Sequence, residues 1–168
     1  MAAVLAIRQA HVGDQPAIVR TFGEERFFTD RLQRQQEGHG ELLVAYEGDA
    51  AIGVVYVWRG EAEEPELREH LPDVPLLNHL EVVEHRRNDG IGTAIIEAAE
   101  AHVLGLGLKK LALGLRLHNH DAARLYDRLG YREWEHGEIW TTYVVMSDGE
   151  ETQVPEKCRI LVKDLTAN

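Results

Sequence analysis

The sequence predicts a mixed α/β (α+β) fold, with helices packed on a central sheet. β-rich runs occur before and after two helical patterns in the middle of the chain, which is typical of this layered architecture. The chain has 168 residues, of which 44% are hydrophobic, so it is long enough to bury one real core. We therefore expect a single domain over residues 1–168.

The first part of the chain predicts one strand followed by helix. Residues 4–7 form a short β-rich run, so we expect a strand there. Asp14, followed by Pro16, is typical of a helix start, because aspartate caps a helix and proline fits its first turn. Helical segments should then fill much of 16–37.

The next elements are predicted to be strands. Two β-rich runs, 41–46 and 52–58, are joined by the glycine-containing sequence EGDA, which indicates an antiparallel hairpin. The acidic, proline-punctuated stretch EAEEPELREHLPDVP (61–75) follows. Strand character returns after it, so we expect a further strand over 76–83.

A central helix is predicted to begin at Gly90 or Ile91 and to end at Gly105 or Gly107. Its residues separate into an apolar face and a face with threonine and glutamate, as helical spacing requires. The residues expected to share the apolar face are Ile91, Ile95, Ala98 and His102.

The C-terminal part predicts a strand, a helix and a final strand pair. Residues 109–117 are strand-like, and HDAARLYDRLGY (120–131) has the spacing of a helix with one buried stripe. Gly130 should close that helix in the left-handed conformation. Beyond it, 139–146 and 159–164 are expected to pair in antiparallel fashion around the turn SDG. The buried stripe consists of Ala122, Leu125, Tyr126 and Leu129.

Charge and cysteine content exclude several classes of partner. The formal net charge is -11, which opposes nucleic acids and anionic membrane surfaces at long range. Cys158 is the single cysteine, so no internal disulfide can form. No apolar run approaches the roughly 20 residues of a membrane helix, and the N-terminus lacks the pattern of a signal peptide. We expect a cytoplasmic protein without nucleic-acid or membrane partners.

A glycine motif in front of the central helix predicts an anion site. Gly90 and Gly92 lie between a strand and a helix N-terminus, where main-chain amides can bind a phosphate. A dinucleotide fingerprint would need a third glycine at Ile95, and a mononucleotide loop would need a lysine directly after Gly92, where Thr93 stands. The remaining pattern, Arg87-x-x-Gly90-x-Gly92, suits a pyrophosphate that is not cleaved.

A second motif accompanies the first. The glycine motif follows LEVVEHR and precedes, by about thirty residues, the pattern Asn119-x-x-Ala122-x-x-Leu125-Tyr126-x-x-Leu129-Gly130-Tyr131. In this order the two motifs resemble the GNAT family of acetyl-CoA-dependent N-acetyltransferases, with the close match over 76–131. The resemblance implies a mixed, mostly antiparallel central sheet of about six to seven strands flanked by about four helices.

The resemblance implies acetyl-CoA as the acetyl donor. The pantetheine arm would lie along the fourth strand and bond to its main chain at Val82 and Val83, a pairing that does not depend on side chains. Asp89, a carboxylate close to an anion, must then point away from it. The residues that match the pyrophosphate loop are Arg87, Asn88, Asp89, Gly90, Ile91, Gly92 and Thr93.

Two residues of the second motif have alternative explanations. Asn119 matches an amide that meets the pantetheine, next to Ala122, but it is also a suitable helix N-cap. Tyr126 matches a general acid that protonates the departing thiolate, but a core tyrosine with a bonded hydroxyl fits the same pattern.

The reaction also calls for a base and an oxyanion site. A primary amine is mostly protonated at neutral pH and must lose a proton before attack. The resemblance places Glu81 or His79 near the acceptor, as a base acting directly or through water, and the amide of Val82 at the oxyanion. Regular alternation puts His79 and Glu81 on one face and Asn78 on the other, although a bulge would re-aim them.

The acceptor is expected to be a small molecule with a basic nitrogen. A protein or peptide acceptor and a non-catalytic acyl-CoA-binding module remain alternatives. Asn78 and Trp58 are candidate acceptor contacts, and the acidic run 61–69 is either a solvated surface or the mouth of the acceptor pocket. No metal is expected, because HNH at 118–120 lacks the companion ligands of a metal motif. A homodimer through the C-terminal strands is possible in such proteins.

Overall fold

A computed structural model describes residues 4–166. Within that range the chain forms one eight-stranded sheet in the order β1-β2-β3-β4-β5-β8-β6, with β7 paired to β8. Only β4 and β5 pair in parallel, so the sheet is mixed and mostly antiparallel, as expected. The strands are β1 (Leu5–Gln9), β2 (Gly40–Glu47), β3 (Ala50–Trp58), β4 (Leu76–Val82), β5 (Lys110–Arg116), β6 (Arg132–Glu133), β7 (Ile139–Ser147) and β8 (Glu150–Asp164).

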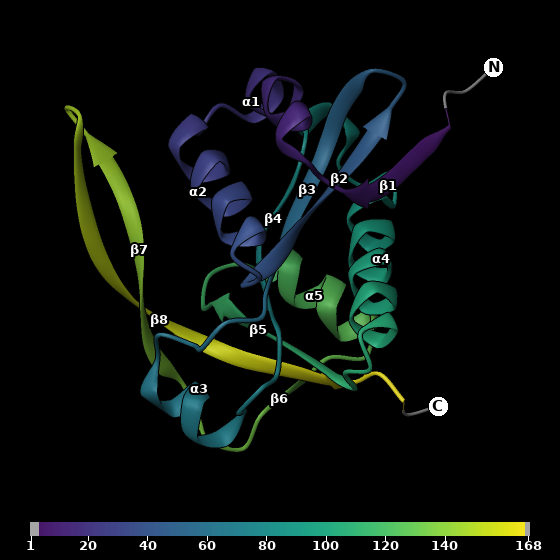
Figure 1. Ribbon diagram of the computed structural model, residues 1–168. Coiled ribbons are helices and arrows are strands. Elements are labelled where there is room, and N and C mark those ends of the chain that lie inside the picture. Colours follow the sequence, from purple (N-terminus) through teal and green to yellow (C-terminus); the bar gives the residue numbers. More distant parts are fainter. Residues whose placement is uncertain (1–3, 167–168) are drawn as a thin grey trace.

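Helices cover both faces of the sheet (Figure 1). Helices α1 and α2 pack on one face over β2 and β3, whereas α4 and α5 pack on the opposite face. The additional helix α3 packs with β5 and β8. The helices are α1 (Gln15–Phe22), α2 (Glu25–Gln36), α3 (Pro65–His70), α4 (Ile91–Gly105) and α5 (His120–Arg128), with 3-10 turns η1 (Val12–Asp14) and η2 (Glu84–Arg86).

Several predicted elements are confirmed. The runs 41–46 and 52–58 lie within the antiparallel hairpin β2–β3. Gly130 has a φ of 95° and follows α5, as its left-handed role requires. The strand expected over 4–7 is shifted and covers Leu5–Gln9. Helix α3 was not predicted, although Pro65 occupies its first turn.

The predicted face of α4 is partly wrong. Ile91 and Ile95 are buried, but Ala98 and His102 are only half-buried. The ring of His102 points toward β2, where its Nε2 lies 2.5 Å from the buried carboxylate of Glu41. The buried face of α4 is therefore rotated about the helix axis relative to the predicted face. It consists of Ile91, Ile95, Ile96, Ala99 and Val103.

The C-terminal pairing also differs from the prediction. The expected strand 159–164 pairs with β5 rather than with β7, and β7 pairs with 150–158 of the same long strand. After the turn SDG, the 15-residue strand β8 pairs first with β7 and then with β5. Its first half and β7 form a hairpin that extends away from the sheet (Figure 1).

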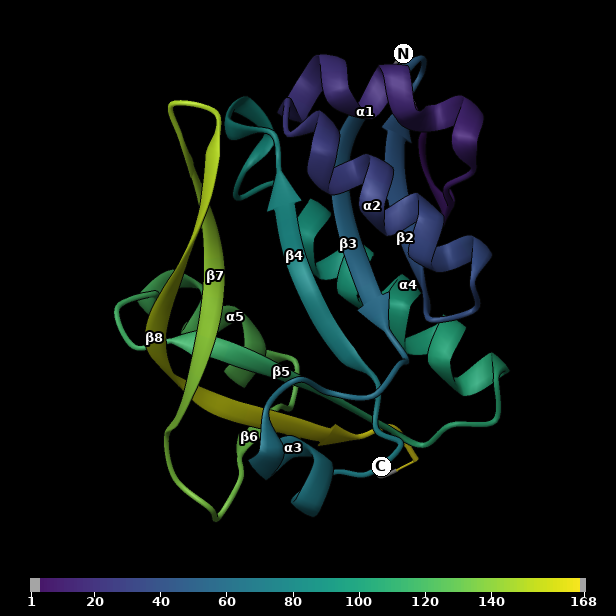
Figure 2. The ribbon, with the colours of Figure 1, turned by 60° about the vertical axis from the view of Figure 1, so that its left-hand side comes forward.

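Strands β4 and β5 diverge. They pair only at Leu76 with Ala112 and at Leu77 with Leu113, near their common start. Figure 2 shows β4 continuing upward while β5 turns toward β8. Within the described residues, the edge of β4 beyond Leu77 therefore has no strand partner on the β5 side.

An aspartate network fixes the N-terminal segment to the sheet. Asp14 is buried and accepts hydrogen bonds from both terminal nitrogens of Arg8 and from the hydroxyl of Tyr46. It also accepts from the main-chain amide of His11. The prediction that Asp14 caps α1 is wrong, because its side chain makes no hydrogen bond to that helix and bonds to Arg8, His11 and Tyr46 instead. The hydrogen bond from Arg8 is the main cause that holds the pKa of Asp14 well below its usual range, against the opposing effect of burial.

Asp14→Asn is expected to reduce the free energy of unfolding by about 2 kcal/mol at neutral pH, because charged hydrogen bonds are lost. Since the pKa of Asp14 is lowered in the folded state, its contribution is complete above the ordinary aspartate pKa of about 4 and declines below it. Urea unfolding from pH 7 to pH 3 should show the wild-type advantage shrinking toward low pH. A constant difference across that range would contradict this role.

Candidate active site

The main chain of Val82 faces the gap between β4 and β5. The amide of Val83 donates to the carbonyl of Ile52 on β3 at 2.9 Å. Because successive residues of a strand point their main-chain groups to opposite edges, the amide and carbonyl of Val82 point away from β3. The carbonyl accepts a hydrogen bond from Nε of Arg87 at 3.2 Å. The amide of Val82 is thus oriented toward the unpaired edge.

A β-bulge interrupts β4 next to this point. Tyr56 lies opposite Asn78 and Val54 lies opposite Glu81, so Val55 of β3 faces two residues of β4. His79 occupies the bulge with a φ of 57°. A left-handed residue at this point shifts the alternation of the strand by one residue.

The bulge corrects the predicted faces of β4. Tyr56 and Val54 belong to the core beneath α1 and α2, and residues directly opposite each other share a face. Asn78 therefore lies on the same face as Glu81, not on the opposite one. The opposite face of the strand is filled by Leu77, Leu80 and Val82, which pack toward α4.

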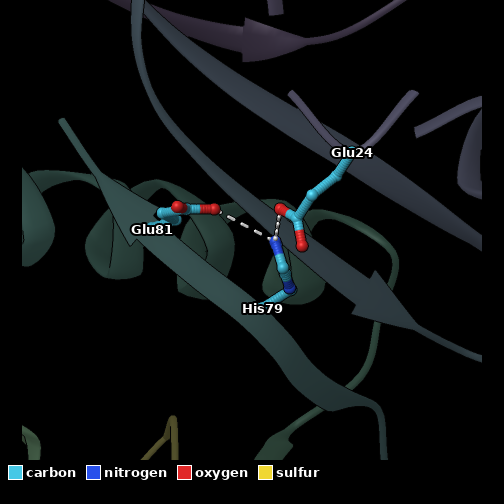
Figure 3. A group of neighbouring side chains, drawn as sticks. All are labelled: Glu24, His79 and Glu81. Carbon is cyan, nitrogen blue, oxygen red and sulfur yellow. Dashed lines mark hydrogen bonds and ion pairs between the residues drawn. The ribbon is translucent and has the colours of Figure 1, made fainter. Parts of the chain in front are cut away.

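His79 lies between two carboxylates (Figure 3). Its Nε2 is 3.1 Å from Oε2 of Glu81 and 3.1 Å from Oε2 of Glu24, which stands in the turn between α1 and α2. The ring also packs against the side chain of Phe27, with 4.1 Å between ring centroids, and meets Phe28 edge-on. The side chain of His79 is 27% exposed, so the cluster is reachable from solvent.

This cluster is also the one group of described histidine, cysteine, aspartate and glutamate side chains close enough to hold a metal ion. Its three ligand atoms lie within 4.8 Å of one another. The histidines of HNH at 118–120 do not belong to it. The expectation of a metal-free protein stays a prediction, and hydrogen bonds to the imidazole nitrogen already account for the geometry.

The glycine motif forms the N-terminus of α4. Gly90 has a φ of 81° and precedes the helix, and Asn88 is left-handed as well, with a φ of 68°. The first main-chain bond at this end runs from the amide of Ala94 to the carbonyl of Gly90 at 3.0 Å. The amides of the first turn, Ile91 to Thr93, precede any intrahelical partner, and no described side chain caps them.

The packing around position 92 does not require a glycine. A Cβ built on it would meet Leu125 Cδ2 at 3.8 Å and Val82 Cγ2 at 3.9 Å, which are ordinary contacts. Its backbone also lacks the positive φ that favours glycine. These two contacts show that α4, β4 and α5 converge at this residue.

The charges around the loop favour an anion. Asp89 forms an ion pair with Arg86 at 3.0 Å, and Arg86 also pairs with Glu47, so the carboxylate of Asp89 is held by a side chain of the protein. Arg87 forms no ion pair with any described residue, and its side chain is exposed. The loop thus presents free amides and one uncompensated arginine.

Tyr126 and Tyr131 are in edge-on contact but differ in their hydroxyl groups. The hydroxyl of Tyr131 donates to Oε2 of Glu100 at 2.8 Å, and Lys163 pairs with the same carboxylate. The hydroxyl of Tyr126 bonds to none of the described residues, and it is not among the fully enclosed atoms without a partner. Burial raises the pKa of Tyr126 to about 12. Tyr126 therefore differs from an ordinary core tyrosine, whose hydroxyl is hydrogen-bonded.

Asn119 acts as the N-cap of α5. Its Oδ1 accepts a hydrogen bond from the amide of Ala122 at 3.1 Å, as the structural alternative predicted. The side-chain nitrogen of Asn119 has no partner among the described residues, so it remains able to donate.

Trp58 lies on the same face of the sheet as Asn78 but at the opposite end of β4 from Val82. It pairs with Leu76, two residues before Asn78, and its ring centroid is 6.3 Å from that of Tyr56, which lies opposite Asn78. Its indole nitrogen donates to the carbonyl of Glu61. The acidic run leads into α3, whose Leu67 packs against β5 and β8. It does not border the cluster around His79.

Sequence reasoning missed Glu24 and Phe27. Both stand about 55 positions before His79 and belong to no motif. No local sequence signal marks either residue, because the left-handed conformation of Glu24 at the start of α2 is visible only in the structure.

A glycine turn at a helix N-terminus beside an open strand edge is an arrangement that suits a phosphate-bearing ligand. Residues 5–131 match the model of the acetyltransferase (GNAT) family, and the chain therefore belongs to this family of acetyl-CoA-dependent acyltransferases. No curated protein is detectably similar in sequence. Within the described residues, no helix is long and apolar enough to cross a membrane.

Solved structures share the fold at low sequence identity. The ribosomal-protein-S18-alanine N-acetyltransferase from Escherichia coli superposes with a TM-score of 0.69 at 17% identity, covering 98% of this chain and 96% of the other. An IAA acetyltransferase from Bacillus cereus gives 0.65 at 18% identity, covering 96% and 99%. The paia N-acetyltransferase from Thermoplasma acidophilum, solved with coenzyme A, gives 0.67 at 13% identity, covering 96% and 99%. These likenesses establish the fold.

Proposed function

We propose that this protein transfers the acetyl group of acetyl-CoA to the nitrogen of a small cationic amine by direct attack in a ternary complex. The amides at the N-terminus of α4 would bind the pyrophosphate together with Arg87. The pantetheine would pair with the open edge of β4 at Val82, next to Asn119 and Ala122. The predicted pairing at Val83 is wrong, because its amide donates to the carbonyl of Ile52 and its carbonyl accepts from the amide of Arg86.

The observation that carries this proposal is the glycine at position 92. Neither backbone conformation nor packing requires a glycine there, and Leu125 and Val82 would tolerate a Cβ. A side chain would instead occupy space in front of the first-turn amides, where a ligand must approach closely. The CoA-bound relative from Thermoplasma acidophilum supports the choice of ligand.

The acceptor can approach a thioester on this edge from one face only. Leu77, Leu80 and Val82 pack toward α4 and fill the other face. The open face carries His79 and Glu81, which are therefore the candidates for removing the proton of the amine, directly or through water.

The steps of the transfer then follow from the residues. The amine nitrogen forms a bond to the carbonyl carbon while the bond from carbon to sulfur breaks. The amide of Val82 would donate to the oxygen on which negative charge develops. Tyr126, whose raised pKa keeps it protonated at neutral pH, would give its proton to the thiolate. The proton of the amine would pass to His79 or Glu81.

Two features support a small and cationic acceptor. Glu24 and Glu81 add two carboxylates to the open face, beside the apolar ring of Phe27. The β7–β8 hairpin is joined to α2 by an ion pair of 3.6 Å between Glu151 and Arg26, and these elements flank β4 on its two sides (Figure 2). Such a link leaves less room for a protein chain than an open groove would.

A thiol-release assay with acetyl-CoA and a panel of acceptors tests the proposal. We expect turnover with small primary amines that carry a positive charge, and little with neutral amines or with peptides that present an N-terminal alanine. Turnover with the peptides alone would assign a protein acceptor, as in the Escherichia coli relative. Binding of acetyl-CoA without turnover on any acceptor would assign a non-catalytic module.

A further inference from the structure

Glu24 contacts the candidate base although it lies far away in the sequence. Its Oε2 is 3.1 Å from Nε2 of His79, the same distance as Oε2 of Glu81. The two carboxylates approach this nitrogen from different elements, Glu81 from β4 and Glu24 from the turn between α1 and α2 (Figure 3). An ionised carboxylate only accepts hydrogen bonds, so Nε2 must carry the proton that bonds to them.

The other ring nitrogen of His79 is then free to act. In a neutral imidazole with the proton on Nε2, Nδ1 is the unprotonated nitrogen. Nδ1 bonds to no described residue, and it is not among the enclosed atoms without a partner, so solvent or an acceptor can reach it. The carboxylates thus select the tautomer in which Nδ1 accepts a proton.

The surroundings of the ring hold it in this orientation. Phe27 packs against the imidazole at a tilt of 32°, and Phe28 meets it edge-on. Arg31 lies over the ring of Phe27, 4.5 Å from its centroid, and is the cation nearest to this stack on α2. The charged groups in contact with His79 are therefore Glu81 from β4 and Glu24 from the α1–α2 turn, and on α2 the cation Arg31 contacts Phe27.

The backbone of Glu24 is kept in an unfavourable conformation. Its φ is 53°, in the left-handed region that glycine adopts more easily. The side chain makes no capping bond to α2, so helix capping does not explain a glutamate at this position. The hydrogen bond to His79 therefore explains the glutamate at position 24.

We propose that Glu24 is a positioning residue for the transfer reaction, which fixes the Nε2-protonated tautomer of His79 and leaves Nδ1 to take the proton of the amine. This role rests on the proposed function. It identifies His79 rather than Glu81 as the base, and the carboxylates of Glu24 and Glu81 act through His79.

The variant that isolates this role is Glu24→Gly. It removes the carboxylate and at the same time relieves the left-handed conformation, so the melting temperature should equal or exceed that of the wild type. We expect kcat to fall by about tenfold to a hundredfold, the size of the loss that follows when the hydrogen-bond partner of a metal-bound histidine is removed. The KM for acetyl-CoA should stay within about twofold. Glu25→Ala removes the neighbouring, exposed carboxylate and should leave kcat unchanged.

Nitrogen-15 spectra of the histidine rings test the same role without turnover. In the free wild-type protein, the signal that disappears in His79→Gln should show the Nε2-protonated form, and in Glu24→Gly it should shift toward a mixture of tautomers. An unchanged tautomer together with an unchanged kcat would overturn the proposal. If no acceptor is turned over by the wild type, the proposed function fails while the tautomer measurement still decides the role of Glu24.

A double-mutant cycle gives the final discrimination. If Glu24 acts through His79, then Glu24→Gly should have no further effect on kcat in the His79→Gln background. Equal losses of kcat in both backgrounds would overturn the proposal, because they would show that Glu24 acts independently.

Discussion

Gly92→Ala is expected to weaken acetyl-CoA binding by about a hundredfold or more while making the protein more stable. The Cβ would stand in front of the first-turn amides of α4 and prevent the pyrophosphate from reaching them. Each hydrogen bond to a charged group contributes about 1.5–3 kcal/mol, so losing two of them accounts for this factor. In the helix itself, alanine is favoured over glycine by about 1 kcal/mol, and the Cβ meets only contacts of 3.8–3.9 Å.

The opposite signs of the two effects make this substitution informative. Isothermal calorimetry measures the affinity for acetyl-CoA, and thermal unfolding without ligand measures the stability. Gly105→Ala in the last turn of α4 is the matched control, since a Cβ there meets nothing within 4 Å and should leave the affinity unchanged. Gly90 is less suitable, because any side chain at a φ of 81° strains the loop itself. An unaltered affinity in Gly92→Ala would remove the pyrophosphate from this site.

The sequence was sufficient where the signal is local. The hairpin β2–β3, the start of α4 at its glycines and the left-handed Gly130 all depend on neighbouring residues. The glycine motif could be interpreted for the same reason, because two glycines, Gly90 and Gly92, at a helix N-terminus form a local pattern that favours an anion.

Features that depend on distant pairing were beyond the sequence. The bulge at His79 results from the register between β3 and β4, and it moves Asn78 to the face of Glu81. The contact between His79 and Glu24 joins two segments that no periodicity relates. The division of β8 between two partners likewise follows from the divergence of β4 and β5, which leaves β5 to pair along its length with the end of the chain.

Tyr126→Phe is expected to lower kcat by about a hundredfold to a thousandfold, the usual contribution of a general acid, at unchanged affinity for acetyl-CoA. The hydroxyl of Tyr126 bonds to no described residue, so its removal should not reduce the melting temperature. Because burial raises the pKa of Tyr126 to about 12, loss of its proton should not limit the wild-type rate below about pH 10.

Tyr131→Phe is the matched control for this prediction. It removes a hydroxyl that donates to Glu100, so it should lower the free energy of unfolding by about 1 kcal/mol but leave kcat unchanged. Steady-state thiol release gives kcat, and calorimetry gives the affinity for acetyl-CoA. Equal kcat values for wild type and Tyr126→Phe would show that the thiolate is protonated by another group or by water, and Tyr126 would then be a core tyrosine that only lines the site.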